Sequence, residues 1–390
     1  MGVVVALVLA AAAWFGHAFL MTVTLNVLFA VPLPRPFLKR VRLLIAFLVF
    51  AFPVALVVVY PRQLLAAWAE PPALLDRPIV FAYLAICWFT TLVYLPIVSA
   101  VRAGRRWPDR IAVEKSRVED IAGQLGEKPL GNGKYWRLAG LPGNQCFQVE
   151  FRELIVRPPR LPRVWDGLTI LHLTDLHFCG SPGREFYQRV LDIAMSAGPP
   201  DILAITGDVV DSHHHHKWIV PMIGRLKWNL AAFAILGNHD KYHDPVLVRR
   251  RLTRIGVKVI GNDWTETAVR GEPMIVIGNE TPWFRPAPVL PPLKPDGPFR
   301  LCLSHTPDTL GWARRSGIDL VLAGHVHGGQ VRLPFIGPLF TPSRYSRRFD
   351  CGAFAAGATL MYVGRGLAGG EPLRYNCRPE VTRIVLRKDD

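Results

Sequence analysis

The sequence predicts an α/β domain preceded by a membrane anchor. Three long apolar stretches occupy the first quarter of the chain, and from about residue 146 short apolar runs alternate with helical patterns. That alternation is typical of an α/β sheet with helices on its faces. Half of the 390 residues are hydrophobic, a high share for a soluble protein, and the excess is concentrated in the first hundred residues.

The apolar stretches cover residues 3–31, 43–60 and 79–101. A span needs about 20 apolar residues, so the first and third suffice and the second, interrupted by Pro53, is just long enough. The first stretch is too long for a signal peptide and has no basic n-region. We expect a transmembrane anchor over residues 1–110, a connector with a short helix over 111–145 and a globular domain over 146–390. His17 is expected to pack against a neighbouring helix.

Loop charge predicts the orientation of this anchor. The loops after the first and third stretches are rich in Arg and Lys, whereas the loop over 61–78 has two arginines balanced by two acidic residues. The positive-inside rule assigns both basic loops to the cytoplasm. We therefore expect a multi-pass protein of the inner (plasma) membrane with its globular domain in the cytoplasm.

The formal net charge of +16 narrows the range of partners. A basic protein suits an anionic membrane surface or phosphorylated substrates. No nucleic-acid module or basic helix accompanies the charge, so no nucleic-acid partner is expected. The six cysteines are scattered without a CxxC pair, which argues against a disulfide framework and favours a reducing compartment.

Five apolar runs of the globular domain end in polar residues. They cover residues 168–175, 201–208, 231–240, 299–305 and 318–327, with helical patterns at 184–197 and 244–255 and a half-buried strand pattern at 146–157. Active-site groups of open α/β sheets cluster at the carboxyl ends of strands. We therefore expect the five loops to converge on one edge of a sheet.

These loops carry carboxylates and imidazoles. The motifs are TDLH (Asp175, His177), GDVVD (Asp208, Asp211), GNHD (Asn238, His239, Asp240), SHTPD (His305) and GHVHGGQ (His325, His327). Such a mixture suits borderline divalent metals such as Mn, Fe or Zn, and the glycines at 207, 237 and 324 let the backbone approach closely. Any one tripeptide is common by chance, and a lone Asp at a strand end is usually a helix cap. Five motifs in this order, each after an apolar strand, indicate a metal site.

The series resembles the calcineurin-like metallophosphoesterase superfamily, and its fuller forms are similar to the membrane-associated bacterial branch, over about residues 147–386. The resemblance implies a two-sheet β-sandwich flanked by helices and two metal ions. It assigns Asp175, His177, Asp208 and His327 to one ion, and Asp208, Asn238, His305 and His325 to the other. His239 would be a catalytic residue that binds no metal and is oriented by Asp211. Asp240 either caps the following helix or supports the site.

The resemblance also implies the chemistry of a metallophosphoesterase catalytic domain. Metal-activated hydroxide would cleave a phosphoester or pyrophosphate bond while His239 protonates the leaving oxygen. Of the candidate ions Mn²⁺ is favoured, with Fe or Zn as alternatives. Some members of this branch are UDP-2,3-diacylglucosamine pyrophosphatases of lipid A synthesis, so a lipid-linked phosphorylated substrate is expected.

Two other functions remain open at this point. One is a broad-specificity or cyclic-nucleotide phosphodiesterase, and the other is a metal-binding scaffold of the same fold. The segments 281–298 and 331–349 combine apolar and basic residues, which suits lipid contact, although ordinary packing loops have the same composition. The sequence does not predict the oligomeric state.

Four consecutive histidines, 213–216, directly follow the GDVVD motif. Because seven other residues complete both ions, these histidines are not needed as ligands. We expect them in an exposed loop leading into a helix near Trp218. The alternative is that one of them reaches the substrate phosphate.

Overall fold

The computed structural model describes residues 2–59, 78–294 and 296–389. The chain divides into two compact units, one of residues 1–106 with 334–346 and the other of residues 107–333 with 347–390. The loop that the sequence predicts over 61–78 falls almost entirely on residues 60–77, outside the described residues. Each unit is considered by itself below.

Within its described residues, the first unit contains three helices that are long and apolar enough to cross a membrane, over Leu7–Phe29, Arg35–Val59 and Pro78–Ala103. They correspond to α1 (Gly2–Phe29), α2 (Arg35–Val59) and a third helix built from α4 (Pro78–Phe89), a π-helical turn η2 (Thr90–Tyr94) and α5 (Leu95–Ala103). Helix α2 begins eight residues before the apolar stretch expected from residue 43, so its first turns carry the basic residues of the preceding loop.

Helices α1 and α4 pack closely. A Cβ atom on Gly16 would lie 2.0 Å from the carbonyl oxygen of Cys87, so only glycine permits this approach. The indole of Trp88 donates to the carbonyl of Leu9 over 2.8 Å. His17 is buried, as predicted from the sequence, and its ring stacks on Phe52 at 4.2 Å between centroids.

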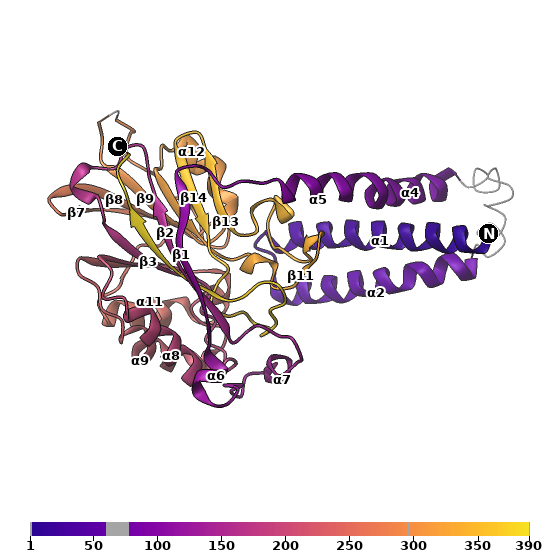
Figure 1. The fold of residues 1–390 in the computed structure, drawn as a ribbon, viewed down its shortest axis with the longest axis horizontal. Helices are drawn as coiled ribbons and strands as arrows, with labels where there is room; N and C mark the ends of the chain where they lie inside the picture. The colour runs from indigo at the N-terminus through magenta and orange to yellow at the C-terminus, as the bar shows by residue number, and fades with distance from the viewer. Residues whose placement is uncertain (1, 60–77, 295, 390) are drawn as a thin grey trace. The chain divides into compact units, whose positions relative to one another are not determined.

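The second unit contains two mixed sheets that face each other (Figure 1). The larger has the strand order β1-β2-β15-β3-β4-β5-β6 and the smaller β13-β14-β10-β9-β8-β7. The strands of the larger sheet are β1 (Ile111–Asp120), β2 (Gln148–Val156), β3 (Thr169–Leu173), β4 (Ile202–Thr206), β5 (Ala231–Ile235), β6 (Lys258–Val259) and β15 (Glu380–Leu386). Those of the smaller are β7 (Trp264–Val269), β8 (Glu272–Asn279), β9 (Phe299–Ser304), β10 (Leu320–Ala323), β13 (Gly352–Ala356) and β14 (Thr359–Val363).

Helices cover the outer faces of the sandwich. The helices of this unit are α6 (Ile121–Leu125), α7 (Trp136–Ala139), α8 (Arg184–Met195), α9 (Ile219–Ile223), α10 (Asn238–Tyr242), α11 (Pro245–Arg254) and α12 (Leu310–Arg315). Helices α8, α9 and α11 share one hydrophobic cluster with the larger sheet, and α12 shares another with the smaller sheet. Short 3₁₀ turns lie at η3 (Arg163–Trp165), η4 (His213–Trp218), η5 (Pro307–Thr309), η6 (His327–Gly329) and η7 (Ser346–Phe349), and two-residue strands at β11 (Arg332–Leu333) and β12 (Gly337–Pro338).

The central strands are mostly apolar, as is typical of strands whose two faces are both buried. In β10, Leu320 and Leu322 face the other sheet, whereas Val321 and Ala323 face the cluster that contains α12. The expected sandwich flanked by helices is confirmed. The expectation of one common edge is wrong in detail, because β3, β4 and β5 belong to one sheet and β9 and β10 to the other.

Strand β1 lies within the segment for which the sequence predicts a connector. It pairs antiparallel with β2 along its whole length and forms the edge of the larger sheet. Most of its side chains are exposed, so it lacks the apolar alternation that marks a half-buried strand. The short helix expected in this segment corresponds to α6 or α7.

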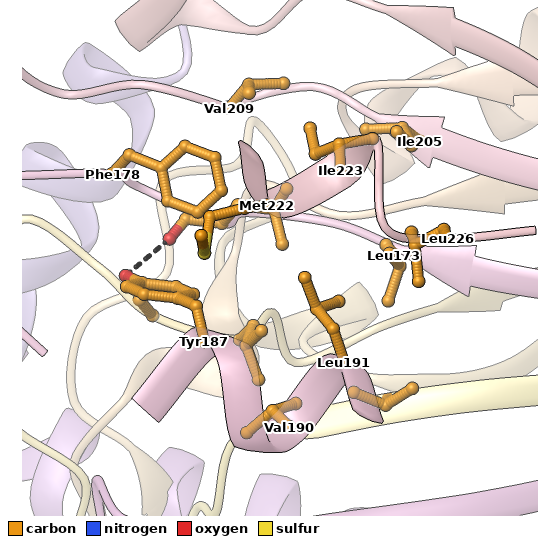
Figure 2. Packing of buried hydrophobic residues seen from close by; sticks show 14 of the residues in the cluster. Leu173, Phe178, Tyr187, Val190, Leu191, Ile205, Val209, Met222, Ile223 and Leu226 are labelled. Atoms are coloured by element: carbon orange, nitrogen blue, oxygen red, sulfur yellow. Dashed lines mark hydrogen bonds between the residues drawn. The ribbon is translucent and has the colours of Figure 1, made fainter. Parts of the chain in front are cut away.

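The packing between α8 and the larger sheet fixes the first metal-site loop (Figure 2). The ring of Tyr187 packs edge-on against Phe178 with centroids 4.9 Å apart. Its hydroxyl donates to the carbonyl oxygen of Leu176 over 2.8 Å. The loop that carries Asp175 and His177 is therefore fixed by a hydrogen bond from a buried tyrosine.

Candidate metal centre

The five strands deliver their polar motifs to one region. Each motif begins within three residues of the end of β3, β4, β5, β9 or β10. The backbone amide of His325 donates to the Asp175 carboxylate at 3.0 Å, which joins the loops after β10 and β3 across the two sheets. The amide of His239 donates to Asp208 Oδ1 over 2.8 Å and joins the loops after β5 and β4.

One group of potential ligands consists of Asp175, His177, Asp208 and His327, whose ligand atoms all lie within 4.8 Å of one another. The Nε2 atoms of His177 and His327 are 3.2 Å apart. His327 Nε2 lies 3.6 Å from Asp175 Oδ1. The four side chains therefore converge, and their ligand atoms are close enough to bind one ion.

A second group consists of Asp208, His305 and His325. His305 Nε2 lies 3.4 Å from Asp208 Oδ2 and 3.0 Å from the amide oxygen of Asn238. Trp283 covers this side, with its ring centroid 4.5 Å from that of His325. Asp208 thus belongs to both groups, and all seven residues expected as ligands lie together.

The donor atoms suit divalent ions. Among the described residues, Oδ2 of Asp208 is buried and accepts no hydrogen bond, which is costly for a carboxylate oxygen unless a cation lies beside it. Nδ1 of His305 lies 2.8 Å from the carbonyl oxygen of Thr206, so in the neutral ring Nδ1 carries the proton and Nε2 carries the lone pair. This lone pair faces another acceptor, the amide oxygen of Asn238. Nitrogen and oxygen ligands of this kind fit Mn, Fe or Zn.

The charges of the site are strongly coupled. Burial opposes the ionisation of Asp208, but His305 and His239 hold its pKa well below the ordinary value. Burial raises the pKa of Asp175. Burial would lower the pKa of His305, yet the Asp208 carboxylate raises it to about 9. Without a metal, a protonated imidazole supplies the positive charge that the carboxylates require.

Asp211 and His239, together with His177, form a third group of potential ligands beside the first. His239 Nδ1 lies 2.5 Å from Asp211 Oδ1. Burial opposes the ionisation of Asp211, but His239 and hydrogen bonds from neighbouring histidines hold its pKa well below the ordinary value. The rings of His239 and His177 meet edge to face at 4.6 Å, so the pair borders the potential ligands.

The backbone is strained where the ligands leave the strands. Asp175, His177, Asp208, His325 and His327 all have positive φ angles, between 44° and 72°. Residues other than glycine adopt this region at a cost of about 1–3 kcal/mol each and do so mainly at functional sites. Two glycines allow neighbouring loops to approach each other closely. Gly207 has a φ of 93°, and a Cβ on Gly324 would lie 1.9 Å from Thr174 Oγ1.

Asp240 supports the site and caps a helix. Its carboxylate accepts hydrogen bonds from the amides of Val209, Val210 and Gly237. The first two amides belong to the loop that carries Asp208 and Asp211, and the third precedes α10. Burial raises the pKa of Asp240 to about 6. Both interpretations of this residue therefore hold.

Two further residues were not singled out in the sequence. His243 Nε2 lies 3.4 Å from Asp211 Oδ1, and its place four residues after His239 is the available signal. Arg374 is buried and donates to the carbonyl oxygens of His327 and Ala368 at 3.1 and 2.6 Å. Ala368 also accepts from His327 Nδ1 at 2.9 Å, which leaves Nε2 of His327 directed at the other ligands.

The four consecutive histidines form the turn η4. His213 and His214 are exposed, as predicted, but His216 is buried and its Nε2 lies 2.5 Å from the carbonyl oxygen of His243. The exposed-loop prediction is therefore wrong for His216, because the 3₁₀ turn directs this ring inward. None of the four occurs in the potential metal groups found among the described residues.

Comparisons with known proteins agree with this geometry. Residues 168–329 match the family model of the calcineurin-like phosphoesterases. The uncharacterized metallophosphoesterase YkuE of Bacillus subtilis is 29% identical over 248 residues, covering 61% of this chain and 86% of the relative. The phosphodiesterase YaeI of Escherichia coli is 32% identical over 228 residues, covering 56% of this chain and 81% of the relative.

A third relative has a more specific name. The UDP-2,3-diacylglucosamine pyrophosphatase LpxG of Chlamydia muridarum is 26% identical over 288 residues, covering 57% of this chain and 85% of that protein. The family match spans all five motif-bearing strands. The chain belongs to the calcineurin-like phosphoesterase family and is a metal-dependent phosphohydrolase.

Proposed function

We propose that this chain is a membrane-anchored phosphohydrolase that binds two divalent ions and cleaves a phosphoester or pyrophosphate bond of a lipid-linked substrate. The observation that carries the proposal is the position of Asp208, which belongs to two groups of potential ligands, the one with Asp175 and the one with His305. A carboxylate shared in this way can bridge two ions. The ligands proposed are Asp175, His177, Asp208, Asn238, His305, His325 and His327.

When bound, the ions supply Lewis acidity, which lowers the pKa of water and neutralises charge on the phosphoryl oxygens. Mn²⁺ is the ion we propose. The chain supplies the proton for the leaving group through His239. Because its Nδ1 donates a hydrogen bond to Asp211, Nε2 is the nitrogen that would face the substrate, and the ionised Asp211 stabilises the charged imidazole.

Two observations favour a lipid-linked substrate. Three helices are long enough to hold the domain at a bilayer, and the relative LpxG is named for a pyrophosphatase activity on a lipid-linked nucleotide. The positive-inside rule favours a cytoplasmic domain, because Arg102 lies in the last turn of the third helix and the first turns of α2 carry Arg35, Lys39, Arg40 and Arg42. Fusions of alkaline phosphatase and of green fluorescent protein to the C-terminus test this orientation, and a periplasmic signal would contradict it.

The second candidate function is a broad-specificity phosphodiesterase, which the name of the relative YaeI favours. The two are separated by measuring kcat/KM of the full chain in nanodiscs with Mn²⁺ on three substrates: UDP-2,3-diacylglucosamine, 3′,5′-cyclic AMP and bis(p-nitrophenyl) phosphate. We expect the lipid-linked pyrophosphate to be preferred by at least about 100-fold, because contacts with remote substrate groups raise kcat/KM. Equal values would support the broad-specificity enzyme.

A metal-binding scaffold of the same fold is the other function that the sequence alone left open. It predicts metal uptake with no turnover of any of the three substrates. The matched variants are His239→Ala, which removes the proposed proton donor, and His214→Ala, which changes an exposed histidine of η4. We expect His214→Ala to behave as the unchanged chain. Equal turnover of all three proteins would remove His239 from the mechanism.

A further inference from the structure

Residues 334–346 leave the phosphohydrolase domain and join the compact unit of the membrane helices. We call this segment the arm. Its first residue, Pro334, lies only seven positions after His327, one of the proposed ligands. The chain that carries two proposed ligands, His325 and His327, therefore runs directly into an element of the helical unit.

Asn26 fixes the arm to α1. Its side chain is fully buried in the last turn of the helix. The amide oxygen accepts from the backbone nitrogen of Thr341 over 2.9 Å, and the amide nitrogen donates to Ser346 Oγ over 2.9 Å. A buried carboxamide in an apolar helix is costly unless both its ends are bonded. The arm satisfies both ends.

Aromatic and glycine contacts hold the same element. The rings of Phe29 and Phe340 meet edge to face with centroids 5.4 Å apart. A Cβ on Gly337, where φ is 85°, would lie 2.7 Å from Nε of Arg102 near the end of α5. The arm thus contacts the last turn of α1 and the end of the third helix.

This end of the helical unit is strongly basic. Helix α2 begins just after α1 and carries Arg35, Lys39, Arg40 and Arg42 in its first turns, and Arg344 of the arm is exposed. Helix α1, with 28 residues, is about 42 Å long, whereas the hydrocarbon core of a bilayer is about 30 Å thick. The ends of such a helix reach the headgroup layer, where positive charges attract anionic lipids.

The arm also exposes apolar side chains at this end. Phe335 is 93% exposed, Tyr345 46% and Leu339 41%. Aromatic side chains beside basic ones are typical of segments that lie in a membrane interface. Because the arm is already fixed to a helix that could cross the membrane, the bilayer is the partner that fits these side chains.

We propose that the arm is a fourth membrane-contacting element, whose partner is the anionic phospholipid surface of the bilayer and whose inserting side chain is Phe335. The basic side chains around it hold lipid phosphates while Phe335 lies among the acyl chains. This contact requires no turnover, so it stands apart from the proposed phosphohydrolase activity.

Photo-crosslinking tests the contact. In the full chain, p-benzoylphenylalanine replaces Phe335, and the protein is placed in nanodiscs that contain radiolabelled phosphatidylglycerol. Phe47 of α2, which is 66% exposed, is the positive control, and Val246 of α11, which is 72% exposed, is the negative control. We expect label transfer at 335 to exceed that at 246 by at least about fivefold. Equal transfer at 335 and 246, or crosslinking to a second copy of the chain, would overturn the proposal.

The lipid composition tests the electrostatic part. Replacing phosphatidylglycerol by labelled phosphatidylcholine should lower transfer at 335 by about threefold or more while leaving Phe47 unchanged. The same yield with both lipids would contradict a preference for anionic headgroups. Hydrolysis is not measured in either experiment, so their failure leaves the phosphohydrolase proposal intact.

Asn26→Leu tests how the arm is held. The variant leaves Thr341 and Ser346 without the carboxamide, so trypsin should cleave after Arg344 at least about fivefold faster. Thr24→Leu is the matched control, because the Thr24 hydroxyl donates to the carbonyl of Leu20 in its own helix. Equal cleavage rates of the two variants would show that Asn26 does not hold the arm.

Discussion

Nδ1 of His239 donates a hydrogen bond to Oδ1 of Asp211 over 2.5 Å, and the same oxygen lies 3.4 Å from Nε2 of His243. The low pKa of Asp211 means that its carboxylate is ionised and accepts a hydrogen bond from the protonated Nδ1 of the ring. The hydrogen bond fixes the tautomer and orientation of His239. An imidazole held in this way is suited to give a proton to a leaving group.

The first prediction concerns this pair. His239→Ala should lower kcat by about 10²–10⁴-fold, because a positioned acid contributes that much. Asp211→Asn should lower kcat less, since the proton donor remains but loses its ionic partner. Both variants should keep their metal, measured by elemental analysis of the purified protein. Loss of metal from His239→Ala would mean that this residue is a ligand.

The second prediction concerns Asp208, which the first and second groups of proposed ligands share. Asp208→Ala should abolish the binding of both ions. His327→Ala should weaken the binding of the first ion and leave that of the second unchanged, because of these two sites His327 belongs only to the first. Calorimetric titration of the metal-free chains with Mn²⁺ gives the number and affinity of sites. Circular dichroism of each variant controls for unfolding. Retention of both sites in Asp208→Ala would rule out a bridging carboxylate.

The third prediction concerns Arg374, which positions His327 without touching the reacting atoms. Its guanidinium binds the carbonyl oxygens of His327, Arg365 and Ala368. Arg374→Met should weaken Mn²⁺ binding by about 10–100-fold, the effect typical of groups that orient a ligand. Arg374→Lys should recover part of the affinity. The control is Arg378→Ala, whose side chain contacts Gln148. If Arg374→Met binds Mn²⁺ as tightly as the control, Arg374 has no part in positioning His327.

The fourth prediction is a dependence of stability on pH. Burial lowers the pKa of His172 from 6.5 to about 4, and the carboxylate of Glu380 only partly offsets this. The unfolded chain therefore takes up a proton near pH 6.5 that the folded chain refuses until about pH 4. The stability from the neutral ring is complete above pH 6.5 and is lost as the pH falls towards 4, by about 3 kcal/mol in total.

His172→Gln isolates this contribution, because the amide does not titrate. The measurement is the thermal unfolding midpoint of the metal-free chain in detergent from pH 7.5 to 4.5. We expect the midpoint of the unchanged chain to fall more steeply than that of His172→Gln. Parallel curves for the two proteins would show that His172 is not buried as a neutral ring.

The strands that carry the site were predictable from the sequence. Apolar runs such as those ending at Leu173 and Thr206 are buried on both faces, and each is followed at once by carboxylates or imidazoles. A run of this kind marks a central strand whatever its partners are. It does not reveal which sheet the strand joins, so the division of five strands between two sheets was missed.

Other features depend on contacts between distant parts of the chain. In the sequence Arg374 looks like an ordinary charged residue. Its burial and its hydrogen bond to Ala368 follow only from the folded loop. The direction of His216 follows from a 3₁₀ turn that four identical residues do not specify. The contact of Asn26 with Thr341 joins residues 315 positions apart. No local pattern predicts such pairs.

The most direct test of the central claim is the metal dependence of hydrolysis by the full chain in nanodiscs. After removal of metal by chelation, the rate with bis(p-nitrophenyl) phosphate or UDP-2,3-diacylglucosamine should fall to the uncatalysed level. It should return on addition of Mn²⁺ in the unchanged chain and stay at the uncatalysed level in Asp208→Ala. Undiminished hydrolysis after chelation, or no hydrolysis of either substrate with Mn²⁺, Fe²⁺ or Zn²⁺, would contradict a metal-dependent phosphohydrolase.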